Sequence, residues 1–180
     1  MMELLTNIKQ DMLSKVLDKK KGLVHLDTYS PVTRITSIRL LVALAAVYGL
    51  KIHQMDVKTA FLNGELENIE QPDGFVVPGK ENKVCKLIKS LYGLKQAPKQ
   101  WHAKFDQTML SNGFKINECD KCVYNKDTPN QEVIVCLYVD DMFIMSKDIA
   151  NIKSTKRMLA SKFDMKDLGV VDVILGIKIL

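Results

Sequence analysis

The stretch Val133-Ile134-Val135-Cys136-Leu137-Tyr138-Val139-Asp140-Asp141-Met142-Phe143-Ile144-Met145 places two adjacent carboxylates between two apolar runs. Runs of this length, rich in β-branched and aromatic residues, predict two strands, so the aspartate pair falls at or beside the turn of a hairpin. Two ionised carboxylates this close repel each other and lose hydration between apolar strands. We therefore expect a neutralising cation, and Mg²⁺, which prefers oxygen ligands, is the first candidate.

A third carboxylate, Asp56, lies near the end of a predicted strand at residues 51–57. If this strand lies beside the hairpin, three carboxylates converge at one edge. Such a cluster can hold two divalent ions that activate a hydroxyl and stabilise the leaving oxygens of a phosphoryl transfer. The alternative is an exposed turn pair and an unrelated aspartate at a strand end.

Apolar periodicity predicts several helices. A first helical segment lies within residues 1–26 and ends at the basic run before Gly22. Thr36 or Ser37 is expected to cap a second helix over residues 38–48, which ends at Gly49. This helix is apolar on most faces, so we expect it to be well buried. Two further helices are expected, one with Pro98 in its first turn and an apolar stripe ending at Asn112-Gly113, and one capped by Asp148.

Strands are expected at residues 51–57, 84–88 and 123–125, as a hairpin over residues 132–146, and at residues 170–180. Neighbouring strands joined by a short turn imply an antiparallel sheet. Helices packed on this sheet give the α+β class.

Composition sets the broad class. The chain has 180 residues, 47% hydrophobic and 26% charged, as expected for one globular domain. Its net charge of +5 weakly favours nucleic acid as a partner. Four cysteines without a disulfide pattern, no signal peptide and no membrane-length apolar run predict a soluble intracellular protein, cytoplasmic or nuclear, with no membrane partner.

These motifs together resemble the reverse transcriptases of copia-type retrotransposons. The resemblance covers residues 27–180, with its blocks in the family order. The matching segments are Tyr29-Ser30-Pro31-Val32, His53 to Gly64 around Asp56, Ser90 to Pro98 with Trp101, Tyr138-Val139-Asp140-Asp141, Met165 to Gly169, and Leu175-Gly176-Ile177. Residues 1–26 have no family resemblance and are interpreted as a separate helical segment.

The resemblance implies a right-hand polymerase palm, with an antiparallel sheet and helices on one face, that copies an RNA or DNA template onto a primer. It implies that Asp56, Asp140 and Asp141 are catalytic and, with the Val57 carbonyl, hold two Mg²⁺ ions, which Mn²⁺ can replace. The resemblance also implies that the incoming dNTP is contacted by Phe61, Gln96 and Lys166. It implies that the primer and template are contacted by Tyr138, Leu175 and Gly176.

Phe61 matches a steric gate, because an aromatic ring under the sugar leaves no room for a 2′-hydroxyl. Gln96 carries an amide that both donates and accepts hydrogen bonds, and Lys166 is a candidate general acid toward pyrophosphate. The bland alternatives are a core aromatic, a polar loop residue and a solvated lysine.

The chain also departs from the family. The basic block before Tyr29 is absent, the stretch Asn63 to Pro72 is short, and no thumb or RNase H region follows Leu180. Fingers and thumb are therefore expected to be largely missing. Other parts of a retrotransposon polyprotein are possible partners, and a virus-like particle is a possible cytoplasmic location.

Three functions stay open. The chain is a reverse transcriptase palm, a decayed non-catalytic remnant that at most binds nucleic acid, or a metal-dependent nuclease. Phe61 and Gln96 at their family offsets favour polymerase ancestry over a nuclease.

Overall fold

The computed structural model describes residues 30–63, 69–70, 76, 78–80, 82–85, 96–127, 132–174 and 176–178. The chain forms two compact units, each described by itself; the first includes residues 61–104, and the second residues 31–60 and 105–180. In the first unit, β2 (Ile69–Glu70) pairs antiparallel with β3 (Val84–Cys85). The predicted strand at residues 84–88 is thus seen in its first two residues, and the rest lies outside the described residues. The domain boundary at residues 26 and 27 also lies outside them.

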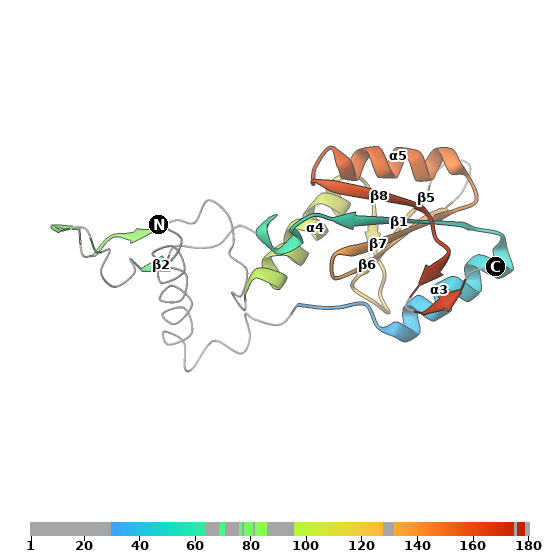
Figure 1. Ribbon diagram of the computed structural model, residues 1–180, viewed down its shortest axis with the longest axis horizontal. Helices are drawn as coiled ribbons and strands as arrows, with labels where there is room; N and C mark the ends of the chain where they lie inside the picture. The colour runs from blue at the N-terminus through green and yellow to red at the C-terminus, as the bar shows by residue number, and fades with distance from the viewer. Residues whose placement is uncertain are drawn as a thin grey trace. The chain divides into compact units, whose positions relative to one another are not determined.

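The second unit is built on a six-stranded sheet in the order β4-β5-β6-β7-β1-β8. Figure 1 shows this sheet, with β1 and β5 to β8 labelled. Every neighbouring pair in this sheet is antiparallel. The predicted α+β class with an antiparallel sheet is therefore confirmed. The strands are β1 (Lys51–Val57), β4 (Lys115–Ile116), β5 (Val123–Asp127), β6 (Glu132–Tyr138), β7 (Asp141–Ser146) and β8 (Met165–Val170).

Helices lie against both faces of this sheet, so the expectation of helices on one face is wrong. Ile38 of α3 (Ile35–Tyr48) belongs to the same buried cluster as Phe143 and Met145 of β7. Met142 and Ile144 alternate to the opposite face, and Figure 1 shows α5 (Ile149–Ala160) on the other side of the sheet from α3. The reason lies in the sequence of β7: it is apolar on both faces, so both require cover.

Helix α4 (Ala97–Ser111) also contributes to the core opposite α3. Phe105 of α4 packs edge-on against Tyr124 of β5, with ring centroids 5.3 Å apart, and stacks with Phe163 at 6.0 Å. The predicted apolar stripe is confirmed, because Trp101, Phe105 and Met109 are all buried.

The ends of the helices agree in part with expectation. Asp148 caps α5 as predicted, since its Oδ1 accepts a hydrogen bond from the Ala150 N–H at 2.8 Å. Gly49 ends α3 in the left-handed conformation, with φ of 64°. The predicted cap of α3 is wrong: the helix begins at Ile35, so Thr36 and Ser37 lie inside it, and the preceding Arg34 makes no side-chain cap.

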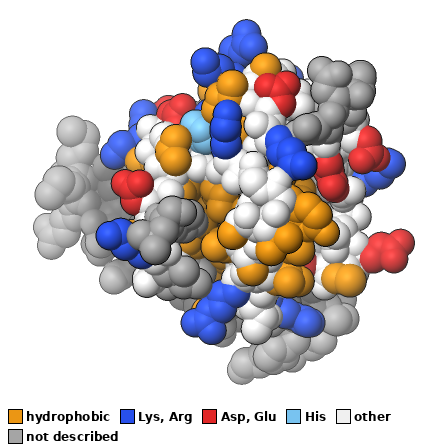
Figure 2. All heavy atoms as spheres, turned by 90° about the vertical axis from the view of Figure 1, so that its right-hand side faces the viewer, with side chains coloured by type: hydrophobic (Ala, Val, Ile, Leu, Met, Phe, Trp, Pro, Cys, Tyr) orange, Lys and Arg blue, Asp and Glu red, His pale blue; other side chains and the backbone are white. Residues whose placement is uncertain are grey.

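The expectation that α3 is well buried is also wrong. Only Ile38 and Ala45 of this helix are buried, whereas Leu40, Val47 and Tyr48 are 61%, 77% and 58% exposed. Figure 2 views the molecule from the side on which α3 lies and shows hydrophobic side chains gathered at the centre of that face. A helix that is apolar all round carries no signal for which side is covered.

The C-terminal region differs from the single strand expected over residues 170–180. Strand β8 ends at Val170, and a separate short hairpin follows, formed by β9 (Val173–Ile174) and β10 (Ile177–Lys178). Gly176 turns the chain between them with φ of 78°. In the part of the chain that the structure describes, no helix combines the length and apolarity needed to span a membrane.

Candidate active site

The Tyr138–Asp141 motif forms the predicted hairpin turn. Tyr138 ends β6, Asp141 begins β7, and the Cα atoms of these two residues are partners across the turn. Val139 has φ of 59°. This conformation is unusual for a β-branched residue, and in two-residue turns it is commonly adopted by glycine. Its surroundings therefore hold the backbone of this turn in a strained conformation.

Strand β1 places Asp56 beside this turn. Its Cα is paired with that of Asp141, and the N–H of Val57 donates to the carbonyl oxygen of Asp140 at 3.0 Å. Directly opposed residues of an antiparallel pair have Cα atoms about 4.5–5.5 Å apart. The structure therefore brings Asp56, Asp140 and Asp141 to one edge of the sheet, as the sequence predicts.

The electrostatics of Asp140 reflect this clustering. Its pKa is raised above the ordinary value, first because the carboxyl is partly buried and then because Asp56 and Asp141 are nearby negative charges. Its Oδ1 atom is buried and has no hydrogen-bond partner among the described residues. A buried acceptor without a partner is costly, so a proton, a water molecule or a cation is needed there.

Gln54 is part of the same site, although it is not among the site residues predicted from the sequence. Its Nε2 atom donates to Asp141 Oδ1 at 2.8 Å. The signal was present in the sequence, because Gln54 lies two residues before Asp56 in a strand and therefore faces the same side of the sheet. This contact orients the Asp141 carboxylate and uses one of its oxygens.

The three carboxylates fit a divalent cation by their chemistry. All are hard oxygen donors of the kind that Mg²⁺ and Mn²⁺ prefer, and the unpartnered Asp140 oxygen is available to such an ion. Over the described ranges, however, no three His, Cys, Asp or Glu side chains are grouped closely enough to hold a metal. The carboxylates are therefore neighbours at the ends of paired strands, without forming a closed group of three ligands among the described residues.

Lys166 lies on the other side of Asp56. It belongs to β8, its Cα is paired with that of Asp56, and its side chain is exposed. Directly opposed residues project to the same face of a sheet, so an ammonium group is available next to the carboxylates.

The three residues predicted to contact the primer and template differ in their surroundings. Tyr138 is half-buried and packs against the apolar cluster beneath α3. Gly176 is exposed in the turn between β9 and β10, whereas Leu175 lies outside the described residues. Their roles stay predictions.

Phe61 and Gln96 belong to the first compact unit. Phe61 is half-buried in the short helix η1 (Ala60–Asn63), and Gln96 is half-buried just before α4. The Oε1 atom of Gln96 is buried without a hydrogen-bond partner among the described residues. An amide oxygen in that state is suited to accept a hydrogen bond from a bound molecule.

Comparison with known proteins identifies relatives along nearly the whole chain. Residues 6–180 match the family described as "Reverse transcriptase (RNA-dependent DNA polymerase)", so the match includes most of the segment at residues 1–26, for which no family resemblance was expected. The chain is 49% identical over 180 residues to the retrovirus-related Pol polyprotein from transposon TNT 1-94 of Nicotiana tabacum, covering 98% of this chain and 14% of that protein. No solved structure matches.

More distant relatives are of the same kind. Identity is 34% over 177 residues with the Pol polyprotein from transposon RE1 of Arabidopsis thaliana, covering 97% of this chain and 12% of that protein. The identity with the Ty1-ER2 Gag-Pol polyprotein of Saccharomyces cerevisiae is 30% over 174 residues, covering 91% of this chain and 10% of that protein. The chain thus spans about one seventh or less of the relatives described here.

Proposed function

Because this chain belongs to the reverse transcriptase family of transposon Pol polyproteins, we propose that it is the palm region of an RNA-directed DNA polymerase. In this proposal it adds deoxynucleotides to the 3′ end of a primer along an RNA or DNA template. The template with its primer, the dNTP and the other parts of a Pol polyprotein are its proposed partners, and its proposed location is intracellular.

The observation that carries the proposal is the pairing of Asp56 with Asp141 beside the unpartnered oxygen of Asp140. These carboxylates and the Val57 carbonyl are the groups we assign to two Mg²⁺ ions. Bound divalent cations would supply Lewis-acid activation of the primer hydroxyl and neutralisation of the phosphates. Gln54 would orient the Asp141 carboxylate through its hydrogen bond to Oδ1.

Lys166 is assigned as the general acid. It lies opposite Asp56 at the same edge of the sheet, so its ammonium can reach a phosphate held there. Proton donation to the leaving pyrophosphate would prevent build-up of negative charge on it, an effect typically worth ~10²–10⁴-fold in rate.

Selectivity and primer contacts complete the proposal. Phe61 is assigned as the gate that excludes a 2′-hydroxyl, and Gln96 as an amide contact to the incoming nucleotide. Tyr138, Leu175 and Gly176 are assigned to the primer and template.

A non-catalytic remnant is the second candidate. It is favoured because no three His, Cys, Asp or Glu side chains in the described ranges are close enough together to hold a metal ion. The net charge of +5 is compatible with retained nucleic-acid binding. Such a remnant would bind nucleic acid with a strong dependence on salt and without catalysis.

Primer extension distinguishes the two candidates. The full chain is tested on poly(rA)/oligo(dT) with dTTP and Mg²⁺ or Mn²⁺, beside the Asp140→Asn, Asp141→Asn double variant. Asp172→Asn, an exposed carboxylate outside the site, is the matched control. Extension that is lost only in the double variant supports the polymerase. Nucleic-acid binding by folded protein without extension supports the remnant.

A further inference from the structure

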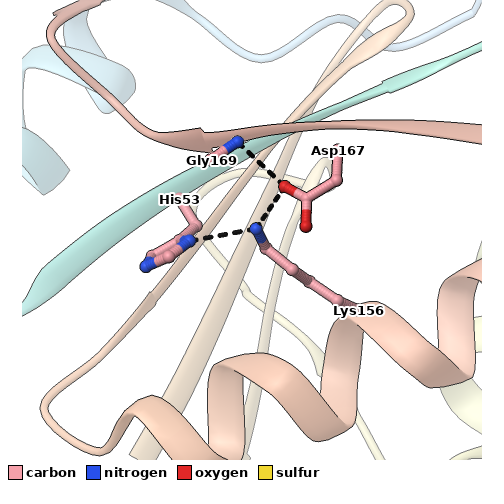
Figure 3. Close-up of polar contacts among 4 residues, drawn as sticks. All are labelled: His53, Lys156, Asp167 and Gly169. Atoms are coloured by element: carbon pink, nitrogen blue, oxygen red, sulfur yellow. Dashed lines mark hydrogen bonds and ion pairs between the residues drawn. The ribbon is translucent and has the colours of Figure 1, made fainter.

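A buried lysine of α5 contacts the last two strands of the sheet, β1 and β8 (Figure 3). The Nζ atom of Lys156, a residue only 9% exposed, lies 2.9 Å from His53 Nδ1 and donates to Asp167 Oδ1 at 2.5 Å. His53 belongs to β1 and Asp167 to β8. Because an ammonium group only donates, Nδ1 of His53 must accept, which places the imidazole proton on Nε2.

Asp167 also holds an irregularity in β8. Met55 is paired with Asp167 and Gln54 with Gly169, so Leu168 is an extra residue in this strand. Gly169 has φ of 82°, as expected for a β-bulge. Its N–H donates to Asp167 Oδ1 at 2.8 Å, so one carboxylate oxygen accepts from both Gly169 and Lys156.

This bulge decides which side chain lies opposite Asp56. With the bulge, Lys166 is the partner of Asp56. If the bulge were removed while Gln54 stayed opposite Gly169, the first half of β8 would shift by one residue. Asp167 would then lie opposite Asp56, and Lys166 would move to the other face of the sheet. The shift would replace the ammonium group of Lys166 by the carboxylate of Asp167 at the position opposite Asp56.

We propose that Lys156 is a positioning residue: by holding Asp167 it fixes the bulge that places Lys166, and not Asp167, opposite Asp56. The catalytic consequence rests on the proposed polymerase function, whereas the effect on strand register does not.

The burial of Lys156 explains why it favours the observed register. Ile152 and Leu159 are fully buried and fix α5, so the lysine does not move with β8. A one-residue shift would carry Asp167 to the opposite face and leave a buried ammonium with only the imidazole as partner, which is unfavourable. By contrast, the Lys58–Asp164 ion pair is well exposed on both sides and loses little when it opens.

The register is tested by NMR on the full chain with Lys156→Met, which keeps the length of the side chain and removes its charge. Lys153→Met, on the exposed side of the same helix, is the matched control. In the parent and the control, cross-strand NOEs should join Met55 to Asp167. In Lys156→Met they should shift to Leu168, and the Gly169 amide should exchange at least ~10-fold faster. Unchanged NOEs and unchanged Gly169 exchange would overturn the proposal.

A variant on the partner side keeps the test decisive if Lys156→Met does not fold. Asp167→Asn retains an oxygen for the Gly169 N–H but removes the charge that pairs with Lys156. It should also accelerate Gly169 exchange, and exchange at the parent rate would count against the proposal. Lys156→Arg retains charge and donors and should preserve the Met55–Asp167 NOEs; loss of these NOEs would contradict a positioning role based on charge.

Kinetics then test the link to Lys166. If the chain polymerises, Lys156→Met and Lys166→Met should each lower kcat by ~10-fold or more with little change in the KM for dTTP, and combining them should add no further loss. If the fold-loss of kcat in the double variant equals the product of the two single losses, Lys156 does not act through Lys166. If the parent shows no extension, the proposed function fails, and the NMR result still decides whether Lys156 sets the register.

Discussion

Asp56 and Asp141 lie directly opposite each other on two neighbouring antiparallel strands, although 84 residues separate them in the sequence. Each approaches from a different element, Asp56 from the end of β1 and Asp141 from the start of β7. The turn residue Asp140 completes the group through the hydrogen bond of its carbonyl oxygen with the Val57 N–H.

Replacing Asp140 by Asn should remove the response to divalent cations. In the parent, Mg²⁺ or Mn²⁺ should raise Tm, because an ion that binds only the folded state stabilises it. In Asp140→Asn the shift should vanish, and Tm without cation should equal or exceed that of the parent, since repulsion from Asp56 and Asp141 is removed. Thermal unfolding with and without cation measures both effects. Asp172→Asn serves as the control, and a persistent cation shift in Asp140→Asn would argue against this site.

Replacing Val139 by Gly should stabilise the turn. The left-handed conformation costs a β-branched residue about 1–2 kcal/mol, while glycine loses about 0.5–1 kcal/mol through unfolded-state entropy. The free energy of unfolding should therefore rise by up to ~1 kcal/mol, as measured by urea denaturation. Val139→Ala retains the Cβ atom and should show no such gain. Equal stabilisation by both variants would mean that the turn is not strained at this position.

Helix α3 should tolerate change on one side and not on the other. Ile38→Ala removes a fully buried side chain and should cost about 2–5 kcal/mol of unfolding free energy. Val47→Ala, at a position 77% exposed, should stay within about 0.5 kcal/mol of the parent. Chemical denaturation of the two variants gives the comparison. Similar losses at both positions would indicate that a further surface covers the exposed side of α3 in solution.

Stability should fall in mildly acidic solution through His53. Burial, followed by the charge of Lys156, lowers the pKa of His53 below the ordinary value of 6.5; Lys51 and Lys153 act in the same direction, and Asp167 opposes them. Because the folded state resists protonation more than the unfolded state, this contribution is complete above pH 6.5. It is lost as the pH falls through that value toward the folded-state pKa.

The test is Tm measured between pH 7.5 and pH 5.0. His53→Gln, which cannot titrate, should show a weaker decline over this range than the parent. Asp167, whose pKa is lowered from the ordinary value of 3.8, keeps its full contribution down to that value, so it should not add to the decline of either protein over this range. An identical pH dependence of parent and variant would show that His53 is not the group responsible.

The local pattern was sufficient for most of the elements. Strand β1 has the expected bounds, residues 51–57, and follows Gly49, which ends the preceding helix; Asp148 caps α5 as expected, because its side chain acts on the next turn. The C-terminal hairpin was missed because glycine at position 176 turns a segment that otherwise continues as an apolar run. Local chemistry sets the type of each element, but a single turn decides whether one strand or two are formed.

What the sequence determined by itself is the helices α3, α4 and α5, the strand β1 and the hairpin of β6 and β7, together with the three aspartates carried at the ends of these strands. The tertiary structure alone decided that helices cover both faces of the sheet and that a bulge beside Gly169 places Lys166 opposite Asp56. The physical reason is range. Propensity, caps and turns act over a few neighbouring residues, whereas strand register and the pairing of the buried Lys156 with Asp167 arise when distant segments exclude water together.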